Sequence, residues 1–186
     1  MQDDIIYILM DYYKQKLYIP QVDQDDNTIG KIERWEAHEK GILHRAFDVA
    51  IYYEGKIICQ HRKHPVYDGV VDFTATSHPY FIGNDFQDMV EGVYSTLKRE
   101  WNMNKEDLLY TPKHVGKIYY KSTDGKYLEH EICHYYVSET KTMPTINYEY
   151  AYGYSLMTAE EMKTKNNPLT KAIAPWIQEA LNQNLL

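Results

Sequence analysis

A β-hairpin is the feature of this sequence that most constrains its fold. The apolar, tyrosine-rich runs 115–121 and 127–137 are separated by a turn at 122–125 that ends in Asp-Gly, a sequence typical of antiparallel hairpins. The second run carries two glutamates, Glu129 and Glu131, on either side of a histidine. Residues two apart on a strand point to the same face, so these carboxylates are expected to project together. They form either a solvated stripe of charge or a site for a metal or for acid–base chemistry.

Composition places the chain among ordinary globular proteins. Of its 186 residues, 44% are apolar and 25% are charged, which predicts one domain over residues 1–186 with a sizeable core. The net charge of −7, without a basic block, argues against nucleic-acid partners. Apolar runs fall short of the roughly 20 residues that span a membrane, so no membrane partner is expected. Two cysteines and no signal peptide predict a cytoplasmic location.

The rest of the chain alternates between predicted strands and predicted helices. Apolar runs bounded by turn-forming residues predict strands over residues 17–23, 44–53, 56–61, 71–76 and 150–157. Helical spacing of apolar residues predicts helices over residues 3–16 and 85–101, the second with Asp85 as its N-cap. A short helix capped by Thr158 and a final amphipathic helix opened by Pro168 follow. These elements predict an α/β (α+β) domain with a mixed sheet between helices.

Several short motifs occur in an order that resembles one enzyme family. In chain order they are Gly30, Glu36-Ala37-His38, Leu43-His44-Arg45-Ala46-Phe47, Ser77-His78-Pro79 and Glu129-His130-Glu131. This order is similar to that of the type I isopentenyl-diphosphate isomerases, the isomerase branch of the Nudix superfamily. The resemblance covers residues 21–176 and leaves 1–16 as an extra N-terminal helix. It implies a Nudix-type αβα sandwich around a mixed β-sheet.

The resemblance also implies a site for one divalent metal. In the family three histidines and two glutamates hold the metal, and the matching positions in this chain are His38, His44, His78, Glu129 and Glu131. Imidazole and carboxylate ligands together suit Zn, Mn, Fe or Mg. A single histidine is more often an ordinary core or surface residue, so the metal interpretation depends on the complete set.

Further positions match groups that bind a small-molecule diphosphate in the family. Arg34, Arg62 and Lys63 fall where cations would hold the diphosphate, a task that suits guanidinium geometry. Glu100 matches the residue that would hold a Mg²⁺ bound to the substrate. Trp176 would place its indole face against a transient cation, which such a face attracts when water is excluded.

Proton chemistry is where the chain departs from the family. The resemblance implies that Glu131, assisted by Tyr119, transfers a proton on one side of an alkene and that a cysteine acts on the other side. The position of that cysteine is occupied here by Thr76. A thiol has a pKa of about 8.5, whereas an alcohol is far too weak an acid to exchange a proton readily at neutral pH. Thr76 is therefore expected to form hydrogen bonds but to be a poor replacement.

Three functions remain open from the sequence. The first is an isopentenyl-diphosphate isomerase-like enzyme, the second a divergent Nudix hydrolase of a nucleoside or other diphosphate, and the third a non-catalytic diphosphate-binding relative. A hydrolase needs several carboxylates around Mg²⁺, but Ser95-Thr96 and Arg99-Glu100 leave only one of them in the expected motif. The presence of the metal set, Tyr119, Glu100 and Trp176 favours the first function, whereas the missing thiol favours the other two. The first is the prediction, with the oligomeric state left open.

Overall fold

The computed structural model describes residues 12–164 and 168–185 of the chain. Most of the helix predicted over 3–16 lies outside these residues, and its described end is a short 3-10 helix, η1 (Tyr12–Lys14). None of the helices in the described ranges is long and apolar enough to cross a membrane.

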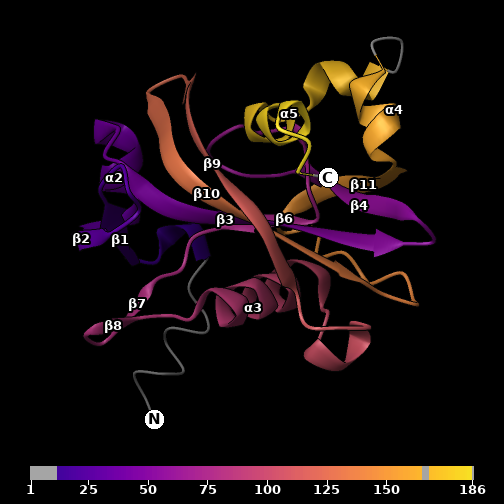
Figure 1. Ribbon diagram of the computed structural model, residues 1–186, viewed down its shortest axis with the longest axis horizontal. Coiled ribbons are helices and arrows are strands. Elements are labelled where there is room, and N and C mark those ends of the chain that lie inside the picture. The colour runs from indigo at the N-terminus through magenta and orange to yellow at the C-terminus, as the bar shows by residue number, and fades with distance from the viewer. Residues whose placement is uncertain (1–11, 165–167, 186) are drawn as a thin grey trace.

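A mixed, nine-stranded sheet forms the centre of the described structure (Figure 1). Its path runs β11-β4-β3-β1-β2, with β10 parallel to β3 and β9 antiparallel to β10. The bounds are β1 (Tyr18–Val22), β2 (Thr28–Glu33), β3 (His44–Tyr53), β4 (Lys56–Arg62), β5 (Val71–Asp72), β6 (Ala75–Ser77), β9 (Lys113–Asp124), β10 (Tyr127–Glu139) and β11 (Ala151–Met157). Two further strands, β7 (Phe81–Ile82) and β8 (Asp85–Phe86), form a separate pair. The predicted hairpins 44–61 and 115–137 are confirmed.

Helices cover both faces of the sheet, as the Nudix sandwich predicts. Figure 1 shows α3 (Met89–Trp101) on one side and α4 (Ala159–Lys163) with α5 (Pro175–Asn182) on the other. The apolar core is divided in the same way into two clusters of buried side chains. One cluster includes Val93, Leu97 and Trp101 of α3. The other cluster includes Trp176 and Ile177 of α5. Burying such large side chains stabilises each layer by roughly 1.5–3 kcal/mol per residue, which holds the strands that carry the site.

Several element boundaries differ from those predicted. Asp85 lies in β8, and the N-cap of α3 is Asp88, whose side chain accepts from two backbone N–H groups. The strand predicted over 71–76 is divided into β5 and β6. Pro168 opens the 3-10 helix η3 (Pro168–Ala172), and the α-helix begins at Pro175. Thr158 caps α4 as predicted, through a capping box.

The helix α2 (Arg34–Lys40), which the sequence analysis did not predict, carries part of the site. It is short because it is capped at both ends: the Glu33 carboxylate accepts from the Glu36 N–H, and Gly41 ends it at φ 62°. A glycine is needed there because the left-handed region costs other L-residues roughly 1–2 kcal/mol. A Cβ at this position would also lie 2.9 Å from Leu128 Cδ1 on β10.

Gly41→Ala is expected to lower the free energy of unfolding by about 2–3 kcal/mol, because backbone strain adds to the clash with Leu128. Gly125→Ala is the matched control, since Gly125 has φ 58° but no atom within 4 Å of a built Cβ. It should cost only the strain, about 1–2 kcal/mol. Chemical denaturation of both variants measures the difference, and equal losses would contradict the contact with Leu128.

Candidate metal centre and adjoining pocket

Four elements bring three histidines and one glutamate to a single point. Parallel pairing of β10 with β3 places Glu131 directly beside His44. His78 follows β6, which pairs with β3, and His38 comes from α2, which packs against β10. The ligand atoms of these four side chains all lie within 4.8 Å of one another. Four of the five residues that the resemblance implies therefore lie together, although they are far apart in sequence.

The histidines are oriented by backbone carbonyls. His38 Nδ1 lies 2.7 Å from the Arg34 carbonyl oxygen, and His44 Nδ1 lies 2.7 Å from that of Ile42. A proton on Nδ1 satisfies each carbonyl and leaves the Nε2 lone pair directed at the cluster, as in many metal sites. His44 Nε2 and His78 Nε2 lie 3.1 and 3.0 Å from Glu131 Oε1. The set of three imidazoles, two of them buried and one half-buried, and one buried carboxylate fits a divalent metal.

Glu129 lies beside this group rather than within it. Its Oε2 is 3.4 Å from His38 Nε2, and the side chain is buried. The group of four that converge within 4.8 Å does not include it. The sequence predicts that both glutamates project from one face of the strand, and in the structure both side chains are buried, 4% and 2% exposed. Their partners differ because Glu129 faces α2, whereas Glu131 faces β3 and β6.

Burial and the two carboxylates together set the protonation of the site. Burial alone lowers the pKa of His38, but the Glu129 carboxylate outweighs it and raises that pKa to about 9. Burial lowers the pKa of His78 to about 3. Burial likewise raises the pKa of Glu129. For Glu131, hydrogen bonds from His44 and His78 outweigh burial and hold the pKa well below its usual range. Glu131 is thus a carboxylate at neutral pH.

Metal binding to the metal-free protein is expected to release a proton from His38 at neutral pH. Its pKa of about 9 means that the imidazole is protonated there and must become neutral to bind a metal. Below about pH 9 the apparent affinity for Zn²⁺ should fall about tenfold for each pH unit until other ligands also titrate. Calorimetric titration in two buffers of different ionisation enthalpy measures the proton count. Binding without proton release would contradict the protonation of His38.

Tyr120, and not Tyr119, is the tyrosine that faces the glutamate. In the β9–β10 register Glu131 lies opposite Tyr120, whose hydroxyl donates a short hydrogen bond to Glu131 Oε2. Tyr119 points to the other face, is 53% exposed and contacts His130 Nε2 at 3.0 Å. The prediction of Tyr119 in the pocket was wrong because successive strand residues alternate between faces.

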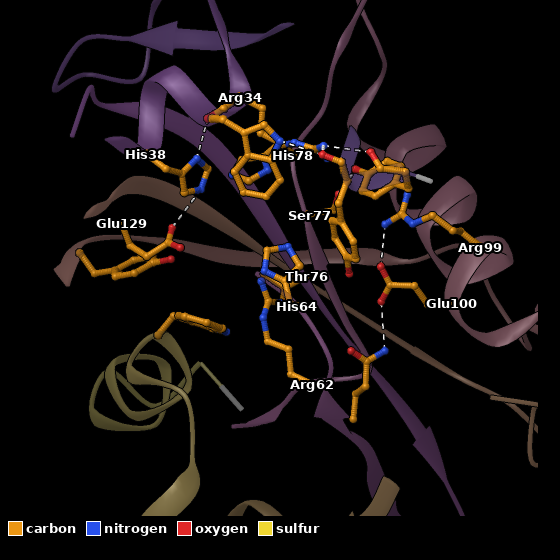
Figure 2. A pocket seen from close by; sticks show the side chains of 16 residues that line it. Arg34, His38, Arg62, His64, Thr76, Ser77, His78, Arg99, Glu100 and Glu129 are labelled. Carbon is orange, nitrogen blue, oxygen red and sulfur yellow. Dashed lines mark hydrogen bonds and ion pairs between the residues drawn. The ribbon is translucent and has the colours of Figure 1, made fainter. Parts of the chain in front are cut away.

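A pocket adjoins the cluster and contains most of the predicted substrate-binding residues (Figure 2). Its wall is made by side chains from both termini and the central strands. They include Tyr12, Tyr13, Arg34, His38, Arg62, Thr76, His78, Arg99, Glu100, Tyr120, Glu129 and Trp176. The cavity volume is about 30 Å³, which holds a water or two. Lys63 is exposed, donates to the Tyr148 carbonyl at 3.2 Å and is not part of this wall, contrary to the sequence analysis.

The pocket cations already have partners within the protein. Arg34 donates to the backbone carbonyl of Tyr12 at 3.0 Å, and Arg62 pairs with Asp72 at 2.9 Å. Arg99, which the sequence analysis did not select, lies 3.9 Å from the centre of the Tyr12 ring. The Nε atoms of Arg34 and Arg99 are buried without a hydrogen-bond partner among the described residues. An anionic ligand in this pocket would therefore meet two guanidinium groups, each with an Nε–H donor that no described residue accepts from.

Glu100 is the carboxylate of α3 that reaches the pocket wall. It is 6% exposed, with Oε1 2.6 Å from Arg99 and Oε2 3.1 Å from the amide of Gln60. Glu91, the other glutamate of α3, has a side chain that is 55% exposed and pairs with Lys105. The helix therefore presents one acidic group to the pocket, where a Nudix hydrolase would need several.

Comparisons with known proteins agree with this geometry. No family model matches the chain. It is 30% identical over 159 residues to isopentenyl-diphosphate Delta-isomerase 1 of Mesocricetus auratus, with 76% of this chain and 69% of that protein covered. It is 27% identical over 160 residues to the isopentenyl-diphosphate Delta-isomerase of Pectobacterium atrosepticum, with 84% and 85% covered.

Solved structures show the same fold at low identity. The crystal structure of DR0079 from Deinococcus radiodurans superposes with a TM-score of 0.67 at 14% identity, covering 89% of this chain and 98% of that one. A MutT Nudix hydrolase from Burkholderia pseudomallei gives 0.54 at 14% identity, with 76% and 97% covered. Fold, converging site residues and sequence similarity agree, and the chain belongs to the type I isopentenyl-diphosphate isomerase family of Nudix-fold enzymes.

Proposed function

We propose that this protein is a metal-dependent isomerase of isopentenyl diphosphate or a closely similar small diphosphate, which it converts by moving a double bond. The observation that carries the proposal is the convergence of His38, His44, His78 and Glu131, with the Tyr120 hydroxyl hydrogen-bonded to the same glutamate. A hydrolase would need further carboxylates on α3, and Glu100 alone reaches the pocket from that helix.

The metal is assigned to the three histidines and Glu131, with Glu129 as a fifth group beside His38. A bound divalent cation supplies positive charge that keeps the glutamate ionised and fixes its orientation. Zn²⁺ and Mn²⁺ suit the imidazole-rich set best, and Mg²⁺ suits the oxygen ligands of the diphosphate together with Glu100.

Glu131 and Tyr120 are assigned to proton transfer. The two residues share a hydrogen, and the carboxylate is held by His44 and His78, so a proton on the tyrosine side can move to the substrate while the position of the carboxylate stays fixed. Protonation of the terminal alkene carbon forms a C–H bond and leaves a positive charge on the neighbouring carbon. The Trp176 ring, 1% exposed, lies in the pocket wall and would stabilise this charge through its face.

Arg34 and Arg99 are assigned to the diphosphate. Both residues line the pocket, and their Nε–H groups have no hydrogen-bond partner among the described residues. Both guanidinium groups lie against the Tyr12 ring. Arg62 is assigned an indirect role, because its guanidinium is engaged with Asp72 behind the pocket wall. Lys63 is left without a substrate role.

The test is incubation of metal-loaded protein with isopentenyl diphosphate in D₂O, followed by NMR. The expected result is deuterium on the terminal carbon together with formation of the isomer in which the double bond has moved inward. Protein stripped of metal is the control and should show neither. A parallel screen for phosphate release from nucleoside diphosphates tests the hydrolase alternative, and release without deuterium incorporation would overturn the proposal.

A further inference from the structure

Tyr67, in the loop 63–70 between β4 and β5, has a backbone conformation that aromatic residues rarely adopt. Its φ is 54°, and among the described non-glycine residues with positive φ it is the only aromatic one. The left-handed region is a genuine outlier for a bulky L-residue, and such strain persists only where the surroundings hold the residue in place. The contacts of Tyr67 show what holds it.

The backbone and the hydroxyl of Tyr67 are both tied to the turn of the β9–β10 hairpin. Its backbone N–H donates to Asp124 Oδ2 at 2.6 Å, and its hydroxyl forms a short hydrogen bond with Ser122 Oγ. Ser122 lies two residues after Tyr120 on β9, so both side chains project from the same face of the hairpin. Tyr67 is thus fixed to the strand that carries one of the proposed proton-transfer residues.

The ring of Tyr67 contacts the indole of Trp176. The two ring centroids lie 5.3 Å apart, and the ring planes meet at 89°. A perpendicular arrangement at this distance is one of the favourable geometries of an aromatic pair. Tyr67 is half-buried and packs against the apolar cluster that contains Trp176, but it is not among the residues that line the pocket. It therefore contacts the indole from outside the pocket.

Hydrogen bonds fix only part of the position of Trp176. Its indole Nε1–H donates to Asp72 Oδ1 at 2.8 Å, and its backbone carbonyl accepts from the Tyr135 hydroxyl at 2.9 Å. Asp72 is held in turn by Thr76, whose hydroxyl also lies within hydrogen-bonding distance of Asp48. A hydrogen bond at Nε1 fixes one edge of the indole, whereas the tilt of the ring plane depends on the groups that pack against it.

Two other groups near the indole are engaged elsewhere. The Tyr120 ring lies 6.1 Å from it, and the Arg62 guanidinium lies 5.4 Å from its centre. Tyr120 donates to Glu131, and Arg62 donates to Asp72. Both side chains therefore have their own polar partners near the site. The ring of Tyr67, by contrast, is brought to the indole at the cost of a strained backbone.

We propose that Tyr67 is a positioning residue that holds the Trp176 indole at the angle that stabilises the substrate cation. The inference rests on the proposed function, because it explains how the ring that faces the cation is kept in place relative to Tyr120. Attraction between a cation and an aromatic ring requires the cation to lie over the ring face. A tilted indole therefore stabilises the cation less, while the binding of the diphosphate is unchanged.

Fluorine NMR of protein labelled with 5-fluorotryptophan tests the contact without any activity. The chain has three tryptophans, and Trp176→Phe identifies the resonance of Trp176. In Tyr67→Leu this resonance should broaden, because the indole samples more than one tilt. The resonance of Trp101, which belongs to the other apolar cluster, should stay unchanged. A Trp176 resonance that does not change, or that changes no more than that of Trp101, would overturn the proposal.

Turnover of isopentenyl diphosphate tests the effect on the chemistry. Tyr67→Leu should lower kcat about tenfold and leave KM unchanged, since the contribution of an aromatic pair is of that order. Tyr67→Phe, which keeps the ring, should recover most of the kcat. Tyr67→Gly should be as slow as Tyr67→Leu, because both lack the ring, although glycine adopts a positive φ without strain.

Tyr152→Phe is the matched control, because the Tyr152 hydroxyl is a second anchor of the same loop. It donates from β11 to Asp68 Oδ2 at 3.1 Å, and the side chain is 58% exposed. This variant should keep the wild-type kcat and KM. A Tyr67→Gly protein with wild-type kcat, a Tyr67→Leu protein in which only KM rises, or a Tyr152→Phe protein as slow as Tyr67→Leu would each overturn the proposal. Wild type without turnover would instead contradict the proposed function, and the fluorine NMR experiment would still test the contact.

Discussion

Glu131→Gln should lower isomerase turnover by about 10²-fold or more and leave the protein with less than stoichiometric metal. The amide cannot accept a proton, and it replaces the one negative charge on which His44 and His78 converge at 3.1 and 3.0 Å. The two losses have different causes, so they are measured separately, by rate with isopentenyl diphosphate and by metal analysis of the purified variant.

Glu39→Gln is the matched control for that experiment. Glu39 is on α2, close in sequence to His38, but its side chain is 48% exposed and pairs with Lys126. It should keep full metal content and rate, because exposed pairs contribute only about 0–1 kcal/mol. A Glu131→Gln protein with wild-type rate and metal would remove Glu131 from both proposed roles.

Arg62→Met should lower the free energy of unfolding by about 3–5 kcal/mol at neutral pH. Methionine fills a similar volume but leaves the Asp72 carboxylate, 1% exposed, without its cation. Removing one partner of a buried pair costs more than the pair contributes, because the remaining charge stays out of water. Denaturation in urea, followed by circular dichroism, measures the change.

Lys126→Met is the control for charge loss alone, since Lys126 and Glu39 form a pair with side chains 67% and 48% exposed. It should change the free energy of unfolding by less than about 1 kcal/mol. The double variant Arg62→Met/Asp72→Leu should recover part of the stability lost in Arg62→Met. A loss below about 1 kcal/mol in Arg62→Met would show that Asp72 is solvated or protonated in the native protein.

The strand pattern predicted the core of the site because its period is simple. The strand alternation placed Glu129 and Glu131 on one face, and the order of the motifs located the histidines. Tyr119 was chosen because it lies ten residues before Glu129, where the family that the sequence resembles has a tyrosine. The structure pairs Asp124 with Tyr127, a tighter turn, and this register sets Tyr120 opposite Glu131. Counting back from a two-residue turn would have found the correct tyrosine.

Other parts of the site could not be predicted, because the local sequence around them does not indicate a site. Asp48 lies within an apolar strand and Asp72 at the end of a two-residue strand, and neither position indicates a pocket. Their meeting at Thr76 depends on three strands that pair only in the folded sheet. The helix α2 was missed because its seven residues carry few apolar side chains, and its caps at Glu33 and Gly41 define it more than periodicity does.

The filling of the pocket has a consequence for how tightly any ligand can bind. Tyr12 and Tyr13 line the pocket together with Arg34 and Arg99, and the Tyr12 ring lies against both guanidinium groups. A ligand that takes the place of these rings competes with aromatic side chains of the chain itself for the same guanidinium groups. Its measured dissociation constant is the intrinsic value divided by the fraction of molecules in which those tyrosines have moved aside. Affinity in this protein is set as much by that internal competitor as by the contacts the ligand makes.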